Sequence, residues 1–73
     1  MNHNILSALL ALYVVVGCWK GHIAIFAGNS TEPWQIFPNK VSSLPAADQE
    51  ALEKGILVRN DRDLQQLLED YLS

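Results

Sequence analysis

The 73 residues suffice for one small domain with a single hydrophobic core. Eight acidic and five basic residues give a net charge of −3, and the basic residues stand singly along the chain. Nucleic-acid binding requires clustered Lys and Arg, so the sequence argues against a nucleic-acid partner. Cys18 is the only cysteine in the sequence, which excludes an intrachain disulfide and a cysteine-based zinc cluster.

The first part of the chain, residues 1–11, is an uncharged and largely apolar leader. Between Ile5 and Val16 every residue except Ser7 is apolar, a run shorter than the ~20 residues of a membrane-spanning helix. Its length fits the apolar part of a signal peptide, although no basic residue precedes it. Two interpretations stay open: a residual membrane anchor or signal segment, and a short apolar helix beside the domain. We assign residues 12–73 to the folded domain.

The sequence after the leader predicts a β-hairpin. Tyr13–Trp19 and His22–Phe26 are rich in β-branched and aromatic residues. Lys20 and Gly21 separate these two runs, and Gly21 can adopt the positive φ that a two-residue hairpin turn requires.

A third short strand is predicted at Trp34–Phe37, after a polar loop over residues 27–33. Pro38 has no N–H to donate to a β-ladder. We therefore expect this strand to lie at an edge of the sheet or to end at the proline.

A short helix and a fourth strand follow. Pro45 fits the first helical position, and Asp48 in the first turn suits the positive end of the helix dipole. Lys54 stands in the last turn and Gly55 suits the left-handed cap. Ile56–Val58 is too short for a helix and predicts a buried strand.

The last element is predicted to be an amphipathic helix. Asn60 can act as N-cap, with Asp61 and Asp63 in the first turn. Because no other helix has a comparable apolar stripe, we expect this helix to hold the domain together. The stripe follows the spacing i, i+3, i+4 and i+7 and consists of Leu64, Leu67, Leu68 and Tyr71.

These elements predict a small α+β fold in the order β-β-β-α-β-α. The sheet should be mainly antiparallel, with three or four strands, and two helices should cover it. The residues expected at turns and caps are Gly21, Pro45, Gly55 and Asn60. The residues expected in the core are Val14, Val16, Ile23, Ile25, Ile36, Leu52, Ile56, Val58, Leu64, Leu67, Leu68 and Tyr71.

A search for catalytic and metal-binding patterns gives no constellation that predicts an enzyme. Neither histidine stands at i, i+3 or i+4 from the other or from a carboxylate, and no serine lies in a nucleophile motif. Cys18 and His22 are the only thiol and imidazole close in sequence, and a hairpin can bring them near each other. We expect no catalytic residue, no metal and no cofactor.

One further motif competes with the strand assignment. Val15–Cys18 reads V-V-G-C, which fits the pattern that precedes a lipidated cysteine in bacterial lipoproteins. Cleavage there would remove the first strand of the hairpin, and bulky Trp19 follows directly. We favour Cys18 as a strand residue and keep lipidation as the alternative.

Four blocks of the sequence carry a family resemblance. They read G-H-I-A-I-F at Gly21–Phe26, S-S-L-P-A-A-D-Q at Ser42–Gln49, G-I-L-V at Gly55–Val58 and L-Q-Q-L-L-E-D-Y-L-S at Leu64–Ser73. In the same order and at similar spacing, they resemble the motifs G-x-I-A-V-F, S-S-L-P-E-E-D-Q, G-I-x-V and E-L-x-x-L-L-E-D-Y-x-S. These motifs belong to the C-terminal domain of the Bypass-of-forespore C (BofC) family.

The resemblance implies a protein of spore-forming bacteria that is exported or membrane-anchored. The founding member of the family acts between forespore and mother cell, where it restrains a secreted signalling serine protease of sporulation. The expected function is therefore a non-catalytic, extracytoplasmic interaction domain whose partner is such a protease. The alternative is a membrane-associated structural module without a protease target, and a cytoplasmic location stays open.

Overall fold

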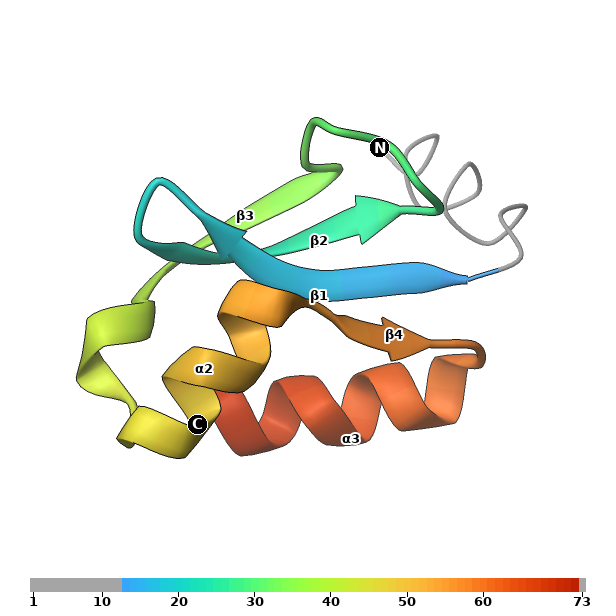
Figure 1. Cartoon of the computed structure of the whole chain (residues 1–73). Helices are drawn as coiled ribbons and strands as arrows, with labels where there is room; N and C mark the ends of the chain where they lie inside the picture. Colours follow the sequence, from blue (N-terminus) through green and yellow to red (C-terminus); the bar gives the residue numbers. More distant parts are fainter. Residues whose placement is uncertain (1–12, 73) are drawn as a thin grey trace.

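The computed structural model describes residues 13–72 (Figure 1). The α+β order predicted from the sequence is confirmed, with one additional 3-10 turn after the third strand. The leader, residues 1–11, lies outside the described residues. In chain order the elements are β1 (Val14–Trp19), β2 (His22–Ala27), β3 (Gln35–Lys40), η1 (Val41–Ser43), α2 (Ala46–Lys54), β4 (Ile56–Val58) and α3 (Asp61–Leu72).

The four strands form one antiparallel sheet in the order β3-β2-β1-β4. β1 and β2 are the predicted hairpin, and they pair over their whole length from Val14↔Ala27 to Trp19↔His22. The turn between them has a positive φ at both central residues, 51° at Lys20 and 86° at Gly21. Such a turn matches the right-handed twist of the flanking strands.

β3 is an edge strand, as Pro38 predicted, but the strand does not end at the proline. It continues to Lys40, and the register with β2 shifts between His22 and Ala24. A shift of this kind leaves a residue of the ladder unpaired. An edge strand that contains such an irregularity tolerates a residue without an N–H.

The hydrophobic core lies between one face of the sheet and the helices. Directly opposed residues share a face, and both residues of the pair Val16↔Ile25 belong to the buried cluster. Figure 1 shows α2 and α3 together on one side of the sheet. The buried cluster consists of Val14, Val16, Ile23, Ile25, Val41, Leu52 and Val58. Ile56 and the stripe of α3 are partly buried and pack against this cluster; the stripe residues are Leu64, Leu67, Leu68 and Tyr71.

Ile36 was expected in the core, and this expectation is wrong. Its side chain is 49% exposed. Ile36 pairs with Ala24, whose neighbours Ile23 and Ile25 point to the opposite, covered face. Directly after β3, Val41 in η1 is buried instead, and its N–H donates to Gly21 O at 2.9 Å.

Pro45 also differs from its predicted role. It stands at the N-cap of α2 and not at the first helical position, with φ −58° and ψ 155°. The extended ψ turns its carbonyl into the helix, where it accepts hydrogen bonds from the N–H groups of Asp48 and Gln49, both at 3.0 Å. Helical geometry therefore begins one residue later, at Ala46.

The core depends more on α2 than the sequence pattern predicted. Leu52 of α2 is 1% exposed, whereas α3 has no fully buried residue.

Within α3, Tyr71 lies near the start of α2. Burial, with smaller contributions from the charges of Asp48 and Asp70, raises the pKa of the Tyr71 hydroxyl above its usual value.

Leu52→Ala is therefore expected to be more destabilising than Leu68→Ala. Truncation of a buried leucine to alanine lowers the stability of a fold by about 2–5 kcal/mol, including the effect of the cavity that it leaves. This loss is as large as the roughly 3–5 kcal/mol of stability that a core of this size supplies. Thermal melts should show Leu52→Ala mostly unfolded at physiological temperature and Leu68→Ala still folded. Equal losses in the two variants would show that α3 contributes as much as α2.

Gly55 ends α2 and permits the close approach of the helix to β1. Its φ is 91°, and a Cβ at this position would lie 2.9 Å from Val15 Cγ1. Its N–H donates to Ala51 O at 2.9 Å and to Leu52 O at 3.2 Å. Two independent constraints, the backbone angle and the contact with Val15, therefore favour glycine here.

A strained backbone alone costs about 1–3 kcal/mol. Gly55→Ala should lower the free energy of unfolding by more than this, because the added Cβ also meets Val15. Gly21→Ala is the matched control, because Gly21 also has a positive φ but a Cβ added there would have no heavy atom within 4 Å. Chemical denaturation measures both losses, and adding Val15→Ala should restore part of the Gly55→Ala loss. Losses of the same size for the two glycine variants would contradict the role of the Val15 contact.

Candidate interaction site

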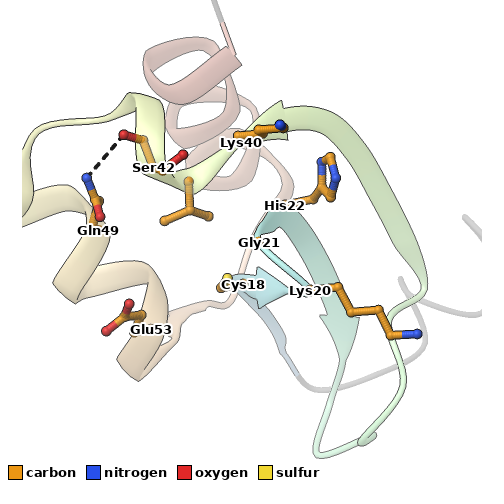
Figure 2. Close-up of a pocket in the computed structure, with 9 residues that line it drawn as sticks. Cys18, Lys20, Gly21, His22, Lys40, Ser42, Gln49 and Glu53 are labelled. Atoms are coloured by element: carbon orange, nitrogen blue, oxygen red, sulfur yellow. Dashed lines mark hydrogen bonds between the residues drawn. The ribbon is translucent and has the colours of Figure 1, made fainter.

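A pocket of about 350 Å³ lies between the turn of the hairpin, η1 and α2 (Figure 2). Gln49 of α2 forms one wall, and its Nε2 donates to Leu44 O at 2.8 Å and to Ser42 O at 3.4 Å. Figure 2 shows Glu53 on the α2 side and Lys20 on the hairpin side. The polar groups of the wall thus hold η1 against α2, which is a structural role.

Cys18 and His22 both line this pocket, but their positions do not make a nucleophile and base. Cys18 is opposite Ile23 in the hairpin, and His22 is opposite Trp19. The two side chains therefore leave the sheet on opposite faces. The imidazole is engaged elsewhere, since Nδ1 lies 3.1 Å from Pro38 O and donates to it. Among residues 13–72 there is also no group of three potential metal ligands.

The reactivity of Cys18 should therefore not depend on His22. We expect His22→Gln to react with a disulfide reagent such as DTNB within about twofold of the parent rate, because a base can activate a thiol only within hydrogen-bonding reach. The rate is measured by thionitrobenzoate release from folded protein. A large loss of rate in His22→Gln, with an unchanged melt, would show that the imidazole acts on the thiol.

The second face of the sheet carries an aromatic pair. Trp19 of β1 and Phe26 of β2 meet edge to face, with ring centroids 6.2 Å apart and an interplanar angle of 64°. The Lys20 ammonium lies 5.6 Å from the centroid of the Trp19 ring. Gly17 lies beneath Phe26, because a Cβ there would be 3.5 Å from Phe26 Cε1. The small residues Gly17 and Ala24 thus let the rings lie across the strands.

Exposed aliphatic side chains flank this aromatic pair on both edge strands. Ile36 of β3 is 49% exposed and Leu57 of β4 is 50% exposed. The register places both on the face of Gly17, since Ile36 pairs with Ala24 and Leu57 pairs with Val15. We define the open face by these five apolar residues: Val15, Trp19, Phe26, Ile36 and Leu57. Grouped apolar surface of this kind is typical of interaction sites.

The turn and cap residues predicted from the sequence lie in the scaffold around these surfaces. Gly21 forms the hairpin turn and Gly55 the end of α2. Asn60 Oδ1 accepts a hydrogen bond from the N–H of Asp63 at 2.8 Å, and Asn60 Nδ2 donates to Asp63 Oδ2 at 2.9 Å. These contacts position β4 and α3.

The open face itself was missed in the sequence. A signal was present, because Val15 and Trp19 alternate with the inward residues Val14 and Val16 in a strand of period two. Only the inward residues are predicted from the sequence, as core.

In the described part of the chain, no helix is both long and apolar enough to cross a membrane.

Comparison with known proteins gives one family. The family model of the BofC C-terminal domain matches residues 6–73, a range that contains every element from β1 to α3. No curated protein and no solved structure matches the chain.

Proposed function

Since this chain belongs to the family of the BofC C-terminal domain, which implies a role in sporulation, we propose that it binds and restrains a signalling protease of sporulation. In this proposal it is a non-catalytic domain that acts outside the cytoplasm. The family resemblance supports the choice of a protease as partner. The open face supports binding to a protein, because it leaves Ile36 and Leu57 exposed.

The exposure of the open face is the observation on which the proposal mainly depends. A domain with a small core gains stability from covering every large apolar side chain that it can. Here two such side chains remain about half exposed on the edge strands. Interfaces between proteins concentrate aromatic and aliphatic residues at their centre, and the pair of Trp19 and Phe26 lies between the exposed residues.

A second candidate function is a membrane-associated structural module without a protease target. The apolar leader, residues 1–11, favours it, and this segment lies outside the described residues. The two functions differ in a direct measurement. A membrane module should sediment with phosphatidylglycerol vesicles when no other protein is present, whereas a protease regulator should bind its partner without lipid.

Affinity capture from sporulating cells tests the proposal with the full chain as bait. The variant Ile36→Lys with Leu57→Lys places two charges on the open face. Gln65→Lys with Gln66→Lys adds the same charge on the exposed side of α3 and is the matched control. We expect the parent and the control to retain a serine protease, and the open-face variant to lose at least about 90% of it. Thermal melts of all three proteins check that each is folded.

Two results would contradict the proposal. The first is capture of no protease by the parent chain. The second is equal capture by the parent and by the folded variant of the open face, which would place binding elsewhere on the domain. A protease that is captured should also be inhibited by the parent chain when its activity on a peptide substrate is measured.

A further inference from the structure

The two edges of the sheet differ in how well they are protected against another strand. The edge strand β3 contains Pro38, a shifted register opposite β2, and the charged Lys40 at its end. Each of these features opposes strand addition. The other edge strand, β4, consists of Ile56–Val58 and has no proline, no charge and no register shift.

β4 has a partner strand on one side only. It pairs with β1 from Val16↔Ile56 to Val14↔Val58, and within residues 13–72 no strand lies on its other side. Successive residues of a paired strand direct their main-chain N–H and C=O groups alternately toward the partner and away from it. Some of the main-chain groups of β4 are therefore directed toward the free edge.

A groove of about 390 Å³ runs along this free edge. One side is β4, including the exposed side chain of Leu57, and the other is the first half of α3, which contributes Leu67. Figure 1 shows α3 next to β4. Arg59 and Asp63 are exposed at the end where the chain passes from β4 to α3. The groove thus combines main-chain groups, an apolar side and one polar end.

We propose that this groove binds an extended segment of the partner, which adds to β4 as a fifth strand. An extended chain can hydrogen-bond to the free main-chain groups of β4, whereas a helix has already used its own. Alternate side chains of the segment would enter the groove against Leu67, so the segment should carry apolar residues at every second position. This inference rests on the proposed function for the existence of a protein partner, and it names the binding mode.

Peptide selection tests the binding mode. A phage library of random linear peptides of about ten residues is selected on the immobilised full chain, and enriched peptides are titrated in solution. We expect alternating apolar residues in these peptides. Leu57→Lys, at the β4 edge, should weaken binding at least about tenfold. Gln65→Lys is the matched control, because Gln65 is exposed on α3 and lies two residues, about half a helical turn, from Leu67, and it should change affinity by less than about twofold.

N-methylation of the peptide separates main-chain pairing from contact by side chains alone. Methyl groups on alternate amide nitrogens remove the donors on one edge of the peptide and leave every side chain in place. One of the two alternate methylation patterns should abolish binding, and the other should preserve it, because a strand uses only one of its edges to pair with β4.

Strand addition is overturned if no peptide is enriched, if Gln65→Lys weakens binding as much as Leu57→Lys, or if both methylation patterns are tolerated. A loss of peptide binding in Ile36→Lys as large as that in Leu57→Lys would also overturn it and would assign peptide binding to the open face. Each of these results leaves protease capture by the parent chain unaffected, so a failure of the binding mode can be told apart from a failure of the proposed function.

Discussion

The close approach of the end of α2 to β1 is the contact on which the other elements depend. A Cβ at Gly17 would lie 3.3 Å from Leu52 O, and a Cβ at Gly55 would lie 2.9 Å from Val15 Cγ1. Both positions are glycine, so the helix end can lie directly against the central strand. Leu52 thereby enters the core, and the chain leaves Gly55 in line to pair with β1 as β4. After β4 the chain continues directly into α3.

The elements that could be predicted from the sequence are those defined by local chemistry. The hairpin follows from two β-rich runs separated by Lys20 and Gly21, and the edge position of β3 follows from the missing N–H of Pro38. The start of α3 follows from the side-chain cap at Asn60, which needs only neighbouring residues. Each of these predictions required information from within a few residues along the chain.

The features that could not be predicted depend on register and packing between distant segments. The inward or outward direction of Ile36 depends on the irregularity between His22 and Ala24, which the sequence of β3 does not encode by itself. The burial of Leu52 could not be predicted, because its helix has only a weak apolar stripe. The residue is buried through the contact of its helix with β1. Cys18 and His22 are near in sequence yet lie on opposite faces, so proximity along a hairpin does not predict contact.

The unequal edges of the sheet limit how this domain can assemble. A sheet that accepted strands at both edges could add copies of itself without end, as fibrils do. Here the Pro38 edge stops growth in one direction, so addition at β4 completes the sheet after a single event. If two copies met through β4, each would use its one available edge and a closed pair would result. The same asymmetry that leaves β4 free for a binding segment thus protects the domain against polymerisation.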